Sequence, residues 1–341
     1  MTDRDEDGRM RAVVVHKPGG PEQLQIEDVP VPSLEPGCVD IEVAASALNR
    51  ADLLQRRGLY SPPPGASDIL GLECAGVVRR VAPGVSGFAR GDRVMALLPG
   101  GGYAERVVAR VELCMHVPQS LGSTEAAAIP EAFLTATEAL FTLGRLGPSD
   151  VVLIHAAAGG VGSAAVQLAK RAGARVIACV GSDEKAAWLA PLGPDRIVKH
   201  REEDFVSACA ELTGGRGVDV VLDFVGGAYA ERHQRCLAET GRWIVLGLLG
   251  GTQSEIDFAL ILRKRLELRG LVMRTRTLAD KQAIVERFRR EFLSDFDTGV
   301  LRPLVDRVYP LSKAGEAHAR MEKNENLGKI VLEMQPSGGS G

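Results

Sequence analysis

A glycine-rich turn at residues 156–162 carries the sharpest chemical signal in the sequence. It reads A-A-A-G-G-V-G, follows an apolar run at residues 151–156 and leads into a helical pattern at residues 160–172. In the G-x-G-x-x-G arrangement that it approximates, one glycine lets the backbone approach a pyrophosphate and another lets the helix pack closely on the strand. A helix N-terminus also offers unpaired N–H donors to phosphates. We therefore expect a dinucleotide phosphate site at Ala158, Gly159, Gly160, Val161 and Gly162.

The end of the second predicted strand indicates which dinucleotide is bound. NAD-binding domains place an acidic residue there to hold the ribose 2′-hydroxyl, and that charge would repel a 2′-phosphate. Here the strand at residues 175–180 ends without an acid, although Asp183 and Glu184 in the next helix argue against a phosphate. We predict NADPH as the cofactor, with its adenosine end held by Gly181, Ser182, Lys185 and His200.

Apolar runs and helical patterns alternate between residues 150 and 273, and they would position this turn. The runs predict strands at residues 151–156, 175–180, 196–199, 218–224, 243–248 and 268–273. Helical patterns lie between them at residues 160–172, 183–190, 203–212, 229–238 and 256–265. Because the runs are apolar without alternation, they indicate a parallel sheet covered on both faces. The order predicts an α/β fold with a doubly wound Rossmann domain.

The remainder of the chain has a different pattern. Short β-branched runs, separated by turns rich in glycine and proline, lie at residues 11–16, 39–44, 75–81 and 93–97. This pattern is typical of a mostly β domain, and it returns after about residue 303. We therefore predict a β domain at residues 10–134 completed by residues 303–334, a Rossmann domain at 135–302, and disordered tails at 1–9 and 335–341.

Composition restricts the class of partner. The 41 basic and 44 acidic residues give a net charge of −3, which provides no basic field for nucleic acid or for an anionic membrane surface. The six cysteines are scattered without a C-x-x-C pair, which is typical of free thiols in a reducing cytoplasm. We find no apolar run of about 20 residues, so we expect no membrane span.

Several long stretches together carry a family resemblance. They are A-A-S-A-L-N-R-A-D at residues 44–52, P-P-P-G-A-S at 62–67, M-A-L-L-P-G-G-G at 95–102, A-A-A-I-P-E-A at 126–132 and L-G-K-I-V-L-E at 327–333. With the glycine turn, they resemble the zinc-free quinone oxidoreductase branch of the medium-chain dehydrogenase/reductase superfamily. The resemblance implies a GroES-like catalytic domain beside the Rossmann domain. It also implies a homodimer, for which the edge at residues 268–273 is the expected contact.

The resemblance also argues against a zinc site. Asn49 and Leu72 stand where the zinc alcohol dehydrogenases of this superfamily have a cysteine and a histidine, and no cysteine lies between Cys114 and Cys179. Leucine cannot bind a metal and asparagine does so poorly, so we predict no metal. Without a Lewis acid the acceptor must stabilise its own negative charge. We therefore expect hydride transfer to quinones, or alternatively to an enone or enoyl thioester, and a low-turnover sensor or structural protein stays open as a third possibility.

The resemblance also implies roles for individual residues. Asn49 would donate its amide N–H to an acceptor oxygen, or else form a turn. Tyr60 would line the acceptor pocket, or anchor its loop. Thr135 would lie near the nicotinamide, or pack within a helix. Lys329 would reach the cofactor phosphates, or lie solvated at a strand edge. The segment expected under the nicotinamide ribose is Gly247, Leu248, Leu249 and Gly250.

Overall fold

The computed structural model describes residues 8–334 and divides the chain into two compact units. Unit 1 contains residues 8–131 and 274–334, and unit 2 contains Ala132–Met273. The chain therefore returns to the first unit at Arg274, whereas we placed this return at residue 303. The reason is helix α9 (Leu278–Glu291), which contacts strand β7 of unit 1 and buries Ile284, Val285 and Phe288.

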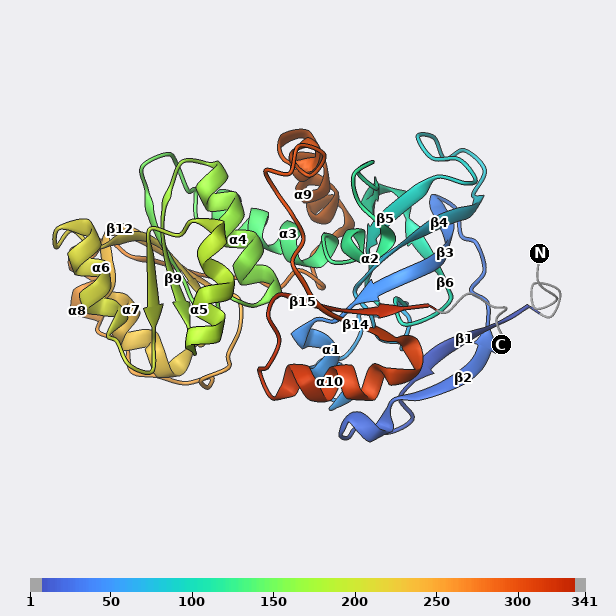
Figure 1. Cartoon of the computed structure of the whole chain (residues 1–341), viewed down its shortest axis with the longest axis horizontal. Coiled ribbons are helices and arrows are strands. Elements are labelled where there is room, and N and C mark those ends of the chain that lie inside the picture. The colour runs from blue at the N-terminus through green and yellow to red at the C-terminus, as the bar shows by residue number, and fades with distance from the viewer. Residues whose placement is uncertain (1–7, 335–341) are drawn as a thin grey trace. The chain divides into compact units, whose positions relative to one another are not determined.

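Unit 2 is built on a sheet of six parallel strands (Figure 1). The strands are β8 (Val151–Ile154), β9 (Arg175–Val180), β10 (Arg196–Lys199), β11 (Val218–Asp223), β12 (Leu237–Val245) and β13 (Glu267–Gly270). Their order in the sheet is β10-β9-β8-β11-β12-β13, and every neighbouring pair is parallel. This order is that of a doubly wound dinucleotide-binding domain, so the predicted Rossmann fold is confirmed.

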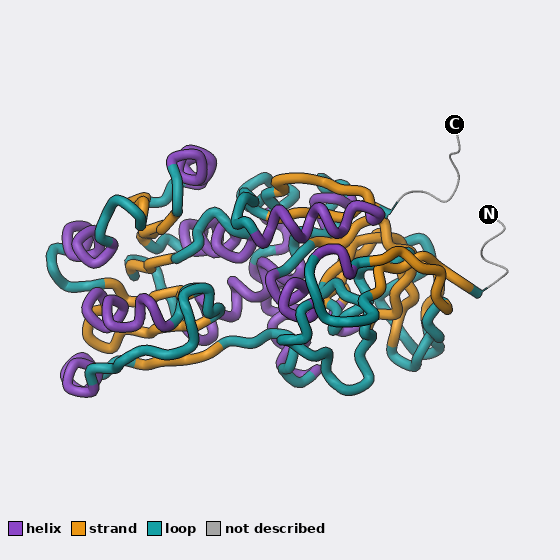
Figure 2. The backbone as a smooth tube through the Cα atoms, turned by 90° about the horizontal axis from the view of Figure 1, so that it is seen from below, coloured by secondary structure: helices purple, strands orange, loops and turns teal. Residues whose placement is uncertain are grey.

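Helices alternate with these strands along the chain. Figure 2 draws the helices in purple and the strands in orange. They are α4 (Gly160–Arg171), α5 (Asp183–Leu189), α6 (Phe205–Thr213), α7 (Ala230–Cys236) and α8 (Phe258–Lys264). Helix α3 (Pro130–Thr137) contains the boundary between the units and continues as a π-helical turn, Glu138–Leu143. All four residues of β8 and all six of β11 are buried, as expected for strands covered on both faces.

Unit 1 is built on a sheet that joins the two ends of the chain. Its strands are β3 (Cys38–Ala47), β4 (Glu73–Val81), β5 (Arg93–Leu97), β6 (Arg106–Arg110), β7 (Cys114–His116), β14 (Val305–Pro310) and β15 (Lys329–Glu333). Their order is β14-β15-β3-β4-β5-β7, with β6 paired to β3. Since β15 pairs antiparallel with β3, the C-terminal segment completes the N-terminal sheet.

Smaller elements surround this sheet. Strands β1 (Arg9–Val14) and β2 (Gln25–Pro30) form an antiparallel pair. The helices are α1 (Arg50–Arg56), α2 (Ser123–Ala126), α9 and α10 (Ala314–Glu322). Of the predicted disordered tails, residues 1–7 and 335–341 lie outside the described residues. The prediction is wrong for Arg9, which begins β1.

One helical segment of the described residues has the length and composition of a membrane span. Ser123–Leu143 reaches a mean hydropathy of 1.2, so our expectation that no such stretch exists does not hold by composition. However, 72% of its most apolar window is buried inside the structure, as in the core helix of a folded domain. The absence of a membrane partner stays a prediction.

All six cysteines are free and buried, which confirms that they are unpaired thiols.

Candidate active site

Three neighbouring strands of unit 1 bring Asn49, Glu73 and Lys329 together. Glu73 begins β4 and Lys329 begins β15, while Asn49 lies two residues beyond the end of β3, which pairs with both strands. The Lys329 Nζ lies 2.6 Å from Glu73 Oε1, 2.7 Å from Asn49 Oδ1 and 2.7 Å from the carbonyl oxygen of Leu48. All three side chains are buried, with Lys329 only 4% exposed.

Lys329 and Asn49, two of the predicted site residues, use the N–H donors of their side chains within this cluster. An ammonium has three N–H donors, and Lys329 has three buried acceptors, so its side chain neither lies solvated nor has a donor left for a phosphate. The Asn49 Nδ2 donates to Glu73 Oε1 at 2.9 Å and to the Ala47 carbonyl at 3.3 Å. The second bond is long, and it is the one that an acceptor oxygen would replace most easily.

A second set of ionisable side chains adjoins this cluster. The Glu131 backbone N–H donates to Glu73 Oε2 at 2.8 Å. Burial and then the Glu73 carboxylate raise the pKa of Glu131 to about 8. The Arg274 guanidinium lies 5.3 Å from the centre of the Tyr60 ring. Burial raises the pKa of Tyr60 and lowers that of Arg274, and the Glu131 charge acts on both groups. Tyr60 therefore lies among ionisable groups, and its place in an acceptor pocket stays a prediction.

A hydrogen-bonded chain leads from this region to the surface. The Tyr103 hydroxyl lies 3.2 Å from Asp52 Oδ2 and 3.2 Å from His318 Nε2. His318 Nδ1 accepts from Arg56 Nη1 at 3.2 Å, and Arg56 pairs with Glu322. Because an arginine only donates, His318 carries its proton on Nε2. Burial raises the pKa of Asp52 to about 6 and lowers that of His318 to about 3.

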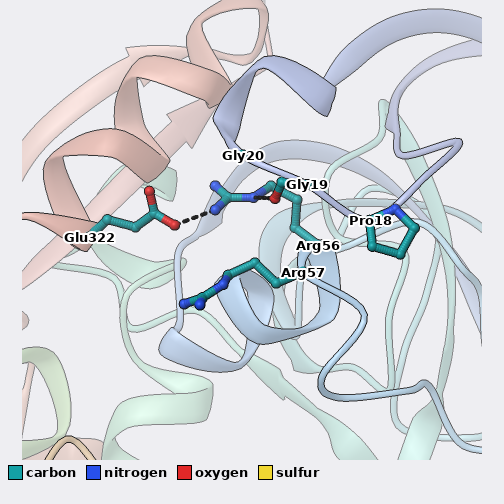
Figure 3. Close-up of a pocket in the computed structure, with 6 residues that line it drawn as sticks. All are labelled: Pro18, Gly19, Gly20, Arg56, Arg57 and Glu322. Carbon is teal, nitrogen blue, oxygen red and sulfur yellow. Dashed lines mark hydrogen bonds and ion pairs between the residues drawn. The ribbon is translucent and has the colours of Figure 1, made fainter.

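The chain ends at a surface pocket of about 270 Å³ (Figure 3). Its lining residues are Pro18, Gly19, Gly20, Arg56, Arg57 and Glu322. The Arg56 guanidinium is fully buried, donates to the Gly19 carbonyl at 3.1 Å and forms the ion pair with Glu322 that Figure 3 shows. None of the predicted site residues lines this pocket, and its arginine is committed to structural contacts.

In unit 2 the glycine turn lies between β8 and α4, where we predict the phosphate site. It follows β8, beside the point where the sheet order reverses between β8 and β11. Gly159 is the N-cap of α4. A Cβ atom on Gly162 would lie 2.4 Å from the Ala156 carbonyl oxygen, so only glycine lets α4 begin this close to the strand. Ala158 is buried, whereas Gly160 and Val161 are partly exposed.

The end of β9 gathers most of the residues predicted for the adenosine end. A Cβ atom on Gly181 would lie 3.3 Å from His200 Nε2. Ser182 caps α5 by accepting the Lys185 backbone N–H at 3.3 Å. The His200 Nδ1 bonds to the Tyr229 hydroxyl at 3.2 Å, a contact that the sequence did not indicate.

One of the two acids that argue against a phosphate, Asp183, is paired with a lysine, whereas Glu184 still argues against it. Asp183 pairs with Lys199 at 2.8 Å, and Lys199 also pairs with Glu202 at 2.6 Å. These ion pairs raise the pKa of Lys199. A carboxylate that is already paired with a lysine repels a neighbouring phosphate less strongly than a free one.

The remaining predicted cofactor residues also lie in unit 2. The Thr135 hydroxyl is buried and has no hydrogen-bond partner among the described residues, so it is available to a ligand. The Gly250 N–H donates to the Val225 carbonyl at 2.7 Å, which ties the segment after β12 to the end of β11. Leu248 and Leu249 are 53% and 56% exposed. Gly247 is partly exposed as well.

Comparison with known proteins decides the family. Two family models match the chain, "Alcohol dehydrogenase GroES-like domain" over residues 35–119 and "Zinc-binding dehydrogenase" over residues 160–289. The 2-haloacrylate reductase of Burkholderia sp is 34% identical over 94% of this chain and 98% of that protein. The quinone oxidoreductase of Rattus norvegicus is 31% identical over 95% and 97%. The chain belongs to the medium-chain dehydrogenase/reductase superfamily. It is therefore an oxidoreductase with a nicotinamide cofactor.

Other members of the superfamily differ in length and in cofactor. A phenolphthiocerol/phthiocerol polyketide synthase of Mycobacterium tuberculosis is 33% identical over 98% of this chain, which spans only 15% of that protein. Among solved structures, an NAD-dependent alcohol dehydrogenase is 36% identical with a TM-score of 0.85, over 95% of this chain and 100% of that one. A mycobacterial protein in complex with NADPH is 30% identical with the same score and coverage. The CurK enoyl reductase is 30% identical with a TM-score of 0.83, over 95% and 99%.

The residues at the superfamily's metal position do not fit a zinc ion. Leu72 is buried and has no donor atom, and the Lys329 ammonium already lies between the Asn49 and Glu73 oxygens. A second cation there would be repelled by the ammonium. Within residues 8–334, no group of three or more His, Cys, Asp or Glu side chains lies close enough together to hold a metal.

The residues of unit 2, by contrast, fit a dinucleotide. The orphaned Thr135 hydroxyl is a feature that a bound ligand would explain, and Gly162 lets α4 begin close to the end of β8. Gly160 and Val161 would face the pyrophosphate with backbone N–H groups at the start of α4. The Gly159 N–H instead donates to the Ala156 carbonyl oxygen at 2.9 Å, so Gly159 would contribute only a close approach of its backbone.

Proposed function

We propose that this member of the superfamily is a zinc-independent, NADPH-dependent quinone oxidoreductase. The observation that carries the proposal is the Lys329 ammonium held between Asn49 and Glu73. An ammonium with all three donors used cannot polarise a carbonyl as a metal does. The acceptor must therefore delocalise the charge that hydride brings, and a quinone does so over its ring.

NADPH is the cofactor that the end of β9 supports best. The strand ends without an acid, Asp183 is paired with Lys199, and His200 and Ser182 lie beside Gly181. NADPH when bound supplies the hydride, while residues of this chain bind the phosphates and orient the nicotinamide. The mycobacterial relative solved with NADPH supports this choice, and the NAD-dependent relative makes the comparison with NADH necessary.

Asn49 and Tyr60 are the side chains that we propose to contact the acceptor. Asn49 would exchange its long bond to the Ala47 carbonyl for a bond to a quinone oxygen. Asn49→Ala is then expected to lower kcat about tenfold or more and to change the Kd for NADPH little, because the residue belongs to unit 1. Unchanged turnover in stopped-flow or steady-state assays would remove Asn49 from the mechanism.

Reduction of an enone or enoyl thioester is the second candidate. The CurK enoyl reductase and the polyketide synthase favour it, since both are similar to nearly the whole chain. The chemistry is closely related, because a conjugated carbonyl also delocalises the charge that hydride brings. A protein that binds NADPH tightly and reduces none of these acceptors would instead serve as a sensor or a structural protein.

We further propose a cytoplasmic homodimer. Strand β13 is an edge of the parallel sheet and carries the exposed Leu268, with the exposed Val272 two residues beyond its end. Helix α8, which precedes β13 in the chain, exposes Phe258 and Leu262. Exposed sheet edges and apolar patches are both typical of interfaces. Six buried free thiols favour a reducing compartment.

The test is to follow NADPH consumption with an ortho-quinone, a para-quinone, an enoyl thioester and no acceptor, with NADH in parallel. Fast oxidation with a quinone and little with NADH is expected. Turnover confined to the thioester would assign the second candidate. NADPH binding without any turnover would assign the sensor or structural role, and equal Kd values for NADH and NADPH would refute the cofactor choice.

A further inference from the structure

Arg274 is the first residue of the segment that returns to unit 1, and its guanidinium is buried without a counter-ion. The residue is 3% exposed, and its Nε donates to the Pro99 carbonyl at 2.8 Å. Both terminal nitrogens, Nη1 and Nη2, are buried and have no hydrogen-bond partner among residues 8–334. No acidic side chain of the described residues forms an ion pair with it.

Such an arrangement is costly for the protein alone. A buried charge that lacks its hydrogen bonds is among the least favourable groups in a folded protein, and arginine cannot relieve the cost by losing its proton. A buried cation of this kind is therefore typical of a site that an anion completes.

The residues around Arg274 hold its guanidinium in one place. The Tyr60 ring lies 5.3 Å away, and the Lys281 ammonium donates to the Arg274 carbonyl oxygen at 2.7 Å. Gly100 faces Nη2, and a Cβ atom there would already lie 3.5 Å from that nitrogen. Lys281 and Arg274 together make this place more positive, with Glu131 as the acid that acts on both.

The unpaired guanidinium also adjoins the residues proposed to contact the acceptor. Tyr60 lies against Arg274 directly. Glu131 acts electrostatically on Arg274 and bonds through its backbone N–H to Glu73, which in turn bonds to Asn49. All of these residues belong to unit 1.

We propose that Arg274 anchors a carboxylate carried by the acceptor, so that the acceptors of this enzyme are conjugated carbonyl compounds bearing an acid group. The two terminal nitrogens of a guanidinium match the two oxygens of a carboxylate in a bidentate pair. The inference rests on the proposed function in that an acceptor is reduced, but it does not depend on whether that acceptor is a quinone or an enone.

Binding can be tested without turnover. Succinate, which cannot be reduced, is expected to raise the Tm of the wild-type protein and to leave that of Arg274→Gln unchanged. Arg276→Gln is the matched control, because it removes the same charge two residues away and should keep the response. No stabilisation of the wild type by succinate, or an equal response in Arg274→Gln, overturns the proposal.

Turnover provides the second test. The substrate pair is 4-oxopent-2-enoate and its methyl ester, which share one conjugated ketone and differ in the carboxylate. We expect the wild-type kcat/KM to be about tenfold or more higher for the acid, and Arg274→Gln to raise KM for the acid about 30-fold while changing the ester less than about threefold. The KM of Arg274→Lys for the acid should lie between the values of the wild type and of Arg274→Gln.

The remaining outcomes separate this inference from the proposed function. An equal loss for acid and ester would mean that the guanidinium acts on the transferred charge, and this overturns the carboxylate anchor. If Arg274→Gln also loses affinity for NADPH in a fluorescence titration, the guanidinium binds the cofactor phosphates. This outcome too overturns the carboxylate anchor. If the wild type reduces no acceptor, the proposed function fails, while the succinate measurement still decides on Arg274. If Arg274→Gln does not fold, the wild-type preference for acid over ester decides instead.

Discussion

Asn49, Glu73 and Lys329 close a set of hydrogen bonds in which one buried cation faces one buried carboxylate. The amide of Asn49 bonds to both charged groups, accepting from the ammonium and donating to the carboxylate. Each partner therefore depends on the other for its charge compensation. Removal of one partner destabilises the fold by more than the intact pair stabilises it, because the remaining charge stays buried without a partner.

The first prediction concerns this pair. Lys329→Met leaves the Glu73 carboxylate buried without its cation, so the free energy of unfolding is expected to fall by about 3–5 kcal/mol. Urea denaturation of Lys329→Met, Glu73→Gln and the double variant measures it. The double variant should cost less than the sum of the single variants by about 2 kcal/mol or more. Additive losses would contradict the coupling that the structure shows.

The second prediction concerns pH. The pKa of Glu131 is raised from 4.5 to about 8, so the folded protein holds this proton more tightly than the unfolded chain. That contribution to stability is complete below pH 4.5 and is lost as pH rises through about 8. Between pH 6.5 and 9 the wild type should lose about 1–2 kcal/mol, allowing for the partial exposure of the side chain.

The variant Glu131→Gln should lose less over this range, whereas Glu286→Gln, an exposed position on α9, should follow the wild type. Two other shifted groups do not interfere. The raised pKa of Asp52, about 6, places most of its loss at lower pH. His318, with a pKa lowered to about 3, loses stability only as pH falls below 6.5. Thermal unfolding at each pH is the measurement, and identical curves for wild type and Glu131→Gln would exclude the shift.

At the scale of elements, the start of α4 is the feature on which the proposed cofactor site depends most. The helix begins within contact distance of the end of β8 because Gly162 has no side chain. Its N-terminus then presents backbone N–H groups beyond the carboxyl end of the strand, where ligands bind in doubly wound sheets.

The third prediction tests this contact. Gly162→Val would place Cβ 2.4 Å from the Ala156 carbonyl oxygen and force α4 away from β8. The Kd for NADPH, measured by fluorescence titration, should rise about 100-fold or more, which corresponds to about 2.7 kcal/mol. Gly147→Ala is the control, because a Cβ atom there meets nothing within 4 Å and should leave the Kd unchanged. Wild-type affinity in Gly162→Val would show that the turn does not hold the phosphates.

At the scale of the whole molecule, the edge strand β13 of unit 2 is the surface at which we propose that two copies form a dimer. Among residues 8–334, strand β13 pairs with β12 alone, and Phe258, Leu262 and Leu268 are 77%, 78% and 56% exposed. Burial of such side chains between two copies contributes roughly 25 cal/mol for each Å² of apolar surface removed from water.

The fourth prediction follows from this edge. The wild type should sediment as a dimer, and the double variant Leu262→Glu/Leu268→Lys should sediment as a monomer, because it places charges within the apolar contact. Val300→Glu is the control, since Val300 is also exposed, at 54%, but belongs to unit 1. A wild-type monomer, or a double variant that stays dimeric, would contradict an interface at this edge.

The sequence alone determined most of unit 2, because the structure there is set by local periodicity. The predicted bounds of β9 and β10 agree with the structure residue for residue, and α4 differs by one residue. Polar elements escaped prediction: α9 buries only three residues, and β2 has none fully buried. Without an apolar pattern such segments lack a signal, and so we placed the return to unit 1 at residue 303 rather than at Arg274.

Only the tertiary structure decided which side chains bond to one another in the site of unit 1. Lys329 meets Asn49 across 280 positions of sequence and Glu73 across 256, and these contacts depend on the register of β15 on β3 and of β3 on β4. Nothing near Lys329 in the chain indicates that its ammonium is enclosed. In the sequence, Arg274 likewise does not differ from the other arginines. It differs in the structure, because its terminal nitrogens are buried without a hydrogen-bond partner among the described residues. Side-chain pairing at such distances is fixed by how strands and loops pack, whereas periodicity, turn chemistry and glycine placement are local and can be read along the chain.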